Sequence, residues 1–267
     1  MLPVMRFGLG VLAVICLLLV PSTPRADLVL EASGTGADGI MLSASATFSI
    51  SGNTLTITLK NEGDGSETDG DKSANTLTGL FFDLPDGITL TPDSATAPKL
   101  LQADQCDAAG PTGCDSTNVN VGGEFVYATG SWSGHDGNYG ISSSGYIDAE
   151  AGGGNFNGDN LDKPDSPDGI NFGIVAPTSE GYLFKPSGKN MSQNPLIDGQ
   201  VVFELTISGG MLDYDDISNV SFQYGTDITE PKLRIPPNVS VPEPSLLLLF
   251  GAGATLGVAR KRQRSRV

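Results

Sequence analysis

The chain has very few of the side chains that most often carry catalysis. Its 267 residues include one histidine, one tryptophan and three cysteines. Any serine–histidine or cysteine–histidine mechanism must therefore use His135, which lies in the glycine-rich stretch Gly130–Gly137. Neighbouring residues of such a loop rarely point at one another, and catalytic triads are assembled from separate parts of a fold. We therefore expect a surface loop here and a protein that is not an enzyme.

Aromatic residues are also scarce, at 7% of the chain, which argues against a long saccharide-binding cleft. Trp132 and Tyr139 are close enough in sequence to form a small stacking platform for a sugar. A secreted carbohydrate-binding module, with extracellular polysaccharide as its partner, is therefore one alternative function. A secreted hydrolase is another. Carboxylate pairs for glycoside hydrolysis would be one form of it, because so many acidic residues make chance pairs of carboxylates inevitable.

The cysteines are consistent with an exported protein. Cys16 lies in the apolar leader, where the bulky residues before it do not fit a lipidation site. Cys106 and Cys114 then remain, with seven residues between them, and an oxidising compartment favours a disulfide between them. Closing so short a loop contributes roughly 2–3 kcal/mol by the chain-entropy estimate. A zinc site is the competing interpretation, but the single histidine cannot complete it.

Basic residues are few outside the two ends of the chain. Of 15 lysines and arginines, two lie in the leader and five in the last eight residues, which leaves eight in residues 27–240. The same stretch holds 30 of the 31 acidic residues, so its formal net charge is −22. A surface this acidic repels nucleic acid and anionic lipid, so we expect no nucleic-acid partner.

Two acidic loops offer oxygen ligands of the kind that Ca²⁺ prefers. Neither fits the EF-hand spacing, since the twelfth position counted from Asn155 is Ser166 and not glutamate. We expect solvated loops and no cofactor, with Ca²⁺ binding as the alternative. The candidate ligands are Asp64, Glu67, Asp69 and Asp71 in the first loop, and Asn155, Asn157, Asp159, Asp162, Asp165 and Asp168 in the second.

The N-terminus has the pattern of a secretory signal peptide. Arg6 supplies the positive charge, residues 7–20 form an apolar run, and the stretch Pro21–Ala26 breaks the helix and ends on a small residue. We expect export through the Sec translocon and cleavage after Ala26. A retained anchor is the alternative, but the run is shorter than the ~20 residues that a spanning helix needs.

The C-terminus consists of three parts in a fixed order. The tripeptide Pro242, Glu243 and Pro244 is followed by an apolar run at 245–259. This run is also short for a full span, but the basic side chains behind it can lengthen the effective span, so we expect a single transmembrane helix. A basic tail at 260–267 should then stop transfer and stay cytoplasmic. Its basic residues are Arg260, Lys261, Arg262, Arg264 and Arg266.

This order of parts resembles the PEP-CTERM sorting signal of exosortase-dependent bacterial surface proteins. The resemblance covers about a tenth of the chain and implies that exosortase, a membrane protease, recognises Pro242, Glu243 and Pro244. It also implies a protein that is anchored transiently in the inner membrane and then reaches the cell surface or extracellular matrix, as in a biofilm. The short sequence Phe222–Thr226 is similar to sequences in the β-rich bodies of such proteins.

The body between the two signals alternates apolar and polar residues with a period of two, which is typical of half-buried strands. Residues 34–39 contain a Gly-x-Gly-x-x-Gly string, but a strand-like stretch follows it, so we expect a hairpin turn and no dinucleotide site. The segment at 92–123 looks irregular. The predicted strands are 28–30, 41–50, 55–59, 76–84, a brief continuation at 88–90, 124–129, 139–148, 170–175, 201–208 and 220–224.

About nine or ten strands without an amphipathic helix predict an all-β fold. We expect an antiparallel β-sandwich of jelly-roll or immunoglobulin-like type, flanked by the N-terminal signal helix and a single C-terminal transmembrane helix. The predicted domains are a signal peptide at 1–26, a surface domain at 27–235, and a proline-rich linker with the sorting signal at 236–267.

Overall fold

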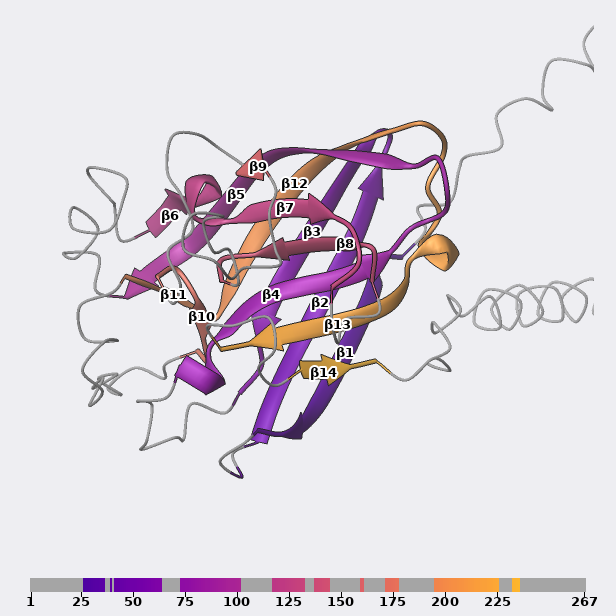
Figure 1. Cartoon of the computed structure of the whole chain (residues 1–267). Coiled ribbons are helices and arrows are strands. Elements are labelled where there is room, and N and C mark those ends of the chain that lie inside the picture. The colour runs from indigo at the N-terminus through magenta and orange to yellow at the C-terminus, as the bar shows by residue number, and fades with distance from the viewer. Residues whose placement is uncertain are drawn as a thin grey trace, which may run out of the picture. The chain divides into compact units, whose positions relative to one another are not determined.

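The structure is a computed structural model, and the all-β class is confirmed (Figure 1). Residues Asp27–Val241 form one compact unit. Within the described residues, regular structure other than strands is limited to three short 3₁₀-helices, η2 (Ser73–Asn75), η4 (Gly122–Glu124) and η7 (Tyr214–Asp216). The described residues are 26–36, 39, 41–63, 73–101, 117–132, 137–144, 159–160, 171–177, 195–225 and 232–235. The predicted signal and transmembrane helices lie outside them.

Fourteen strands join in one hydrogen-bonded sheet that has two halves. The long-strand half comprises β1 (Leu28–Thr35), β2 (Met41–Ser51), β3 (Thr54–Asn61), β12 (Gln200–Ser208), β5 (Thr89–Leu101) and β6 (Thr117–Asn120), in that order. The short-strand half comprises β14 (Lys232–Arg234), β13 (Ser218–Tyr224), β4 (Leu77–Asp83), β8 (Tyr139–Ser142), β7 (Val126–Thr129) and β9 (Asp159–Asn160).

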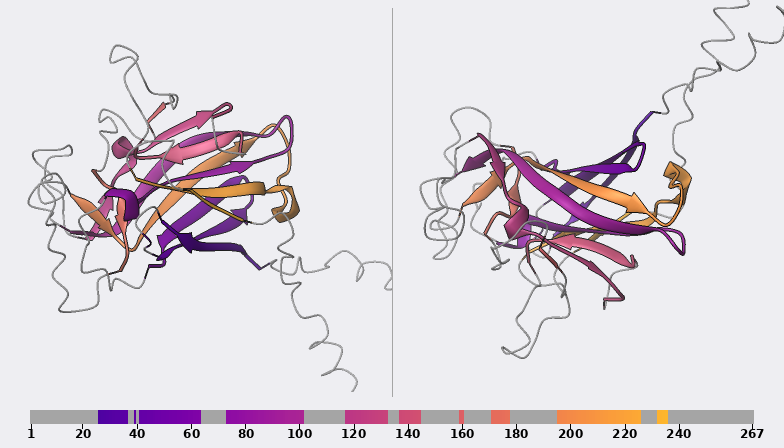
Figure 2. Two further views of the ribbon diagram at one scale, coloured as in Figure 1. Left: turned by 60° about the horizontal axis from the view of Figure 1, so that its bottom comes forward. Right: turned by 90° about the horizontal axis from the view of Figure 1, so that it is seen from above.

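Two short strands join the halves. β11 (Leu196–Asp198) pairs with the end of β5, and β10 (Ile174–Val175) pairs with both β11 and β4. The β10–β11 pair is parallel, so the sheet is mixed and the expected purely antiparallel pairing does not hold throughout. Figure 2 shows β7 and β8 (pink) on the side of the unit away from β1 (indigo).

The alternating pattern of the sequence fixes the register of the long-strand half. β3 alternates buried and half-buried residues along its whole length, and β12 does so along most of it. Phe48 of β2 therefore lies opposite Ile57 of β3, which lies opposite Phe203 of β12, and all three are fully buried. A shift of one residue would turn this row into water, so burial of one face specifies the register.

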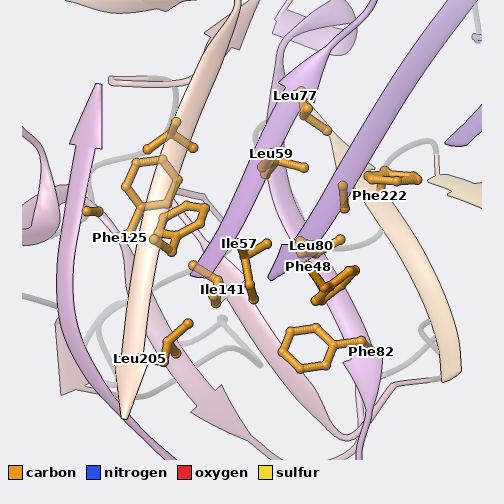
Figure 3. Close-up of a cluster of buried hydrophobic side chains, with 14 of the residues drawn as sticks. Phe48, Ile57, Leu59, Leu77, Leu80, Phe82, Phe125, Ile141, Leu205 and Phe222 are labelled. Carbon is orange, nitrogen blue, oxygen red and sulfur yellow. The ribbon is translucent and has the colours of Figure 1, made fainter. Parts of the chain in front are cut away.

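The core lies between the two halves (Figure 3). Phe48 meets Phe82 of β4 edge-to-face with ring centroids 5.6 Å apart, and Phe125 meets Phe203 in the same way at 5.0 Å. Each fully buried phenylalanine contributes about 1.5–3 kcal/mol by transfer from water, and an edge-to-face pair adds roughly 0.5–1.5 kcal/mol.

The strands predicted at 41–50, 55–59, 76–84, 201–208 and 220–224 are confirmed. The prediction that 92–123 is irregular is wrong at its two described ends, where β5 continues to Leu101 and β6 covers Thr117–Asn120, and residues 102–116 lie outside the described residues. β5 runs through Pro92 because its register against β12 shifts there, so that Glu204 pairs with Ser94 and Leu205 with Pro92. Asp93 is the extra residue of this bulge. Leu90 is buried before the bulge, and Ala95 is the next buried residue after it. The alternation of buried and exposed residues with a period of two is therefore interrupted in the sequence.

The Gly-x-Gly-x-x-Gly string joins β1 to β2, as predicted for a hairpin. The Gly39 amide donates to the carbonyl of Gly36 at 3.1 Å, and Gly39 has φ of +80°, a conformation that glycine adopts readily. Along the described stretches of the chain, no helix has the length and apolar character needed to cross a membrane.

Candidate functional site

Most of the predicted site residues lie outside the residues that the structure describes. This holds for the sorting tripeptide, the basic tail, His135, the two cysteines and the first acidic loop. Of the second acidic loop, Asp159 lies in β9, where it pairs with Tyr127 of β7, and Asp162, Asp165 and Asp168 lie outside. Among the described residues, no group of three or more histidine, cysteine or acidic side chains could hold a metal ion.

The predicted stacking platform of Trp132 and Tyr139 is wrong for Trp132. Its side chain is only 6% exposed and packs with Phe81, Val126 and Ala128 in a small second cluster. The Trp132 and Phe81 rings meet edge-to-face with centroids 5.3 Å apart. Trp132 therefore contributes to packing, because Phe81 faces away from the main core and would otherwise be left exposed.

Tyr139 is half-buried and is held in one orientation from two sides. Its ring stacks on Phe82, with centroids 5.8 Å apart and an angle of 15° between the planes. Its hydroxyl donates to the Ile88 carbonyl at 2.7 Å, which ties β8 to the segment that leads into β5. The ring is therefore fixed by the fold.

Gly137 explains why the β7–β8 hairpin can lie so close to β4. A Cβ at this position would be 2.4 Å from the backbone nitrogen of Phe82, a distance that no side chain can accommodate. The Gly130 amide closes the hairpin by donating to the Asn138 carbonyl at 3.0 Å. Close backbone approach at Gly137 thus places Tyr139 beside the turn that follows β4.

A shallow pocket of about 280 Å³ lies between this turn and the end of the hairpin. The turn has the sequence Pro85-Asp86-Gly87, which lies between the predicted strands 76–84 and 88–90, and Gly87 has φ of +90°. We call this the Tyr139 pocket. It is lined by Leu84, Pro85, Asp86, Gly87, Thr129, Gly130, Ser131, Asn138 and Tyr139.

Two carboxylates shape the electrostatics of the Tyr139 pocket. Burial and then the nearby carboxylates of Asp86 and Asp83 raise the pKa of the Tyr139 phenol, so it stays protonated at neutral pH. Asp83 accepts from the Asn138 amide at 2.6 Å and from the Asn219 side chain at 2.7 Å, so it holds the rim in place. Asp86 is exposed at the rim, and within the described part of the chain its carboxylate accepts no hydrogen bond.

The pocket therefore combines one aromatic ring with a carboxylate, an amide and two hydroxyls. These groups can bind a small polar molecule. Sequence reasoning identified Tyr139 but missed Asp86, Thr129 and Ser131. The Pro-Asp-Gly turn was the one available signal, because a tight turn presents its aspartate to solvent.

Comparison with protein families gives one match, at the C-terminal end. Residues 240–263 match the family described as the PEP-CTERM protein-sorting motif. The chain carries a PEP-CTERM sorting signal. The match includes Pro242, Glu243, Pro244 and the first three basic residues of the tail, and it confirms the resemblance seen in the sequence.

A PEP-CTERM signal implies a protein that is exported, directed to the cell surface and processed by exosortase. The match spans 24 residues, so it describes the destination of this PEP-CTERM protein and leaves the activity of its body open. Comparisons with curated proteins and with solved structures found no match.

Proposed function

We propose that this PEP-CTERM protein is a non-enzymatic component of the cell surface or extracellular matrix. The observation that carries the proposal is the match of residues 240–263 to the sorting motif. The predicted signal peptide at 1–26 supports it, because a protein processed at the surface must first cross the inner membrane, and we propose the Sec translocon as its route. A formal charge of −22 on residues 27–240 would keep an exported body soluble.

The proposed sequence of events has three steps. The leader is removed after Ala26, the apolar run at 245–259 holds the chain transiently in the inner membrane, and exosortase then cuts at the tripeptide Pro242–Pro244. The body is the part that reaches the surface. For it we propose a β-sandwich of jelly-roll or immunoglobulin-like type, supported by two sheet halves that share one core.

Mass spectrometry of the surface form tests the proposal. We expect the chain to end near Pro242–Pro244 and to lack the Arg-rich tail. A Pro242→Ala/Pro244→Ala double variant should remain unprocessed in the membrane fraction. The matched control is Pro236→Ala/Pro237→Ala, which changes the same kind of pair outside the matched residues and should be processed normally. Recovery of the intact Arg-rich terminus on protein from the surface would refute the proposal.

Two further elements of the proposal concern the body. We propose a disulfide between Cys106 and Cys114, supported by the oxidising destination, and non-reducing peptide mapping would detect it. We propose that the body needs no cofactor, with Ca²⁺ binding by the acidic loops as the alternative. Titration calorimetry with Ca²⁺ would decide between the two.

A second candidate function is carbohydrate binding, which the Tyr139 pocket favours. Its fixed ring and polar rim are features of sugar-binding sites. Extracellular polysaccharide would be the partner of such a protein at the surface.

A further inference from the structure

We propose that the Tyr139 pocket binds one pyranose ring of a neutral glycan. The inference relies on the proposed surface delivery only for its biological setting, and the binding itself follows from the geometry of the pocket. The proposal moves the sugar-binding role away from Trp132, which is buried, and assigns it to residues from the 84–87 turn and the β7–β8 hairpin.

The first argument is the preorganisation of the aromatic ring. One contact of the Tyr139 ring is with Phe82, and its hydroxyl is held by the Ile88 carbonyl. The ring therefore loses little conformational freedom when a ligand packs against it, which removes part of the ordering cost of binding. Because the hydroxyl already donates its proton within the protein, it can only accept a hydrogen bond from a ligand.

The second argument is the mixture of groups around the ring. Leu84, Pro85 and Tyr139 bring apolar side-chain surface to the lining, and polar side chains come from both the turn and the hairpin. A pyranose has the matching character, since its ring presents C–H groups on its faces and hydroxyls at its edge. The rim acceptors and donors are the side chains of Asp86, Thr129, Ser131 and Asn138.

The third argument concerns size. Pockets for drug-sized ligands are typically about 300–1,000 Å³, so a volume of about 280 Å³ accommodates one sugar ring rather than several. The remainder of a longer glycan would lie in solvent. Affinity for one ring should therefore be weak, and repeated units on a polymer would strengthen attachment through multivalency.

The fourth argument concerns charge. The carboxylates of Asp86 and Asp83 lie close enough to Tyr139 to raise its pKa, and the surrounding body is strongly acidic. An anionic sugar such as a uronic acid would be repelled by these carboxylates. The hydroxyl groups of a neutral sugar can instead donate hydrogen bonds to the Asp86 carboxylate, and hydrogen bonds to an ionised acceptor are stronger than those between neutral groups.

Titration calorimetry on the full chain, purified in a sugar-free detergent, tests the proposal. The probes are neutral hexose and N-acetylhexosamine oligosaccharides, with oligogalacturonate as the anionic comparison. We expect binding to at least one neutral probe and none to oligogalacturonate. Asp86→Asn should weaken binding by about threefold to tenfold, and Tyr139→Ala by about tenfold or more, which are the changes expected for one charged hydrogen bond and one ring contact.

The matched control is Glu31→Gln, which removes one exposed negative charge from β1 in the other half of the sheet and should leave binding unchanged. Asp86 is exposed, so its variant should fold even if Tyr139→Ala does not. The proposal is overturned if no neutral probe binds, if Asp86→Asn binds as tightly as the unaltered chain, or if oligogalacturonate binds better. None of these results would change the C-terminal mass of the surface form, so surface delivery is tested separately.

Discussion

Tyr127 and Tyr139 are neighbours in the structure with different surroundings. Their ring centroids are 6.4 Å apart, and they come from adjacent strands of the hairpin. The side chain of Tyr127 is buried, whereas Tyr139 borders the pocket. Burial is the main cause that raises the pKa of both phenols, and the proximity of Tyr139 adds to the effect on Tyr127. Both groups are therefore neutral over the physiological range.

The raised pKa values of Tyr127 and Tyr139 predict that the folded chain loses stability at alkaline pH. An unfolded tyrosine ionises near pH 10, and a folded-state pKa above that value means that the folded chain retains protons that the unfolded chain releases. The stabilising contribution is fully present below about pH 10 and is lost as the pH rises through the folded-state pKa. Denaturant titrations at a series of pH values, combined with tyrosinate absorbance, would measure it. Ionisation of all six tyrosines at the ordinary pKa in the folded chain would contradict the prediction.

At the scale of elements, the β7–β8 hairpin depends on its close approach to β4. Phe82 of β4 pairs with Tyr139 of β8, so the hairpin and the pocket share one boundary with the core. Any change that lifts the hairpin from β4 should disturb both stability and the Tyr139 pocket.

Gly137→Ala provides that change. The new methyl group would meet the Phe82 backbone at 2.4 Å, and overpacking of this kind costs about 1–3 kcal/mol of unfolding free energy. Gly130→Ala is the matched control in the same hairpin, because its nearest neighbour would be a Trp132 carbon at an ordinary 3.7 Å. Chemical denaturation of the two variants should separate them by more than 1 kcal/mol. Equal stabilities would show that the hairpin is not held as tightly as the structure indicates.

The sequence predicted elements well where one strand has one buried face. Residues such as Phe48 and Ile57 alternate without interruption, so their strands and their shared face follow from the pattern alone. β5 was missed because the bulge at Asp93 changes which residues face inward, and the partner that causes the shift, Leu205, is more than a hundred residues away. A period of two cannot reveal a register change that another strand imposes.

The candidate site was only half predictable for the same reason. Tyr139 and the Pro85–Gly87 turn were both visible in the sequence, but their meeting depends on the pairing of β4 with β8. Trp132 was misjudged because a glycine-rich loop suggests exposure. Its burial comes from Phe81, which lies in a strand about fifty residues earlier. The sorting signal needed no long-range contact, so it was read completely from the sequence.

At the scale of the whole molecule, charge of one sign dominates. Residues 27–240 hold 30 acidic side chains and eight basic ones, and one ion pair within the described residues joins Lys99 to Asp198. Self-repulsion of this kind destabilises the compact state, and salt screens it over a Debye length of about 8–10 Å at physiological ionic strength.

We therefore expect the melting temperature to rise when NaCl is increased from about 0.01 M to about 0.15 M, where the Debye length falls from about 30 Å to about 8 Å. Differential scanning calorimetry would measure the shift, with an equal osmolality of sucrose as the comparison for effects unrelated to charge. A melting temperature that is constant or falls over this range would show that repulsion among the carboxylates does not limit stability.

The position of β14 has a mechanical consequence for a body that is attached through its C-terminus. It is the last described strand before the sorting signal, it pairs only with β13 among the described strands, and it does so through three residues. Leu233 of β14 also packs against Gly34 of β1, where a Cβ would leave only 2.8 Å. A body attached to the cell through its C-terminus would receive any pulling force first at β14. Under such tension β14 would detach before the long strands, and the core between the two halves would yield last.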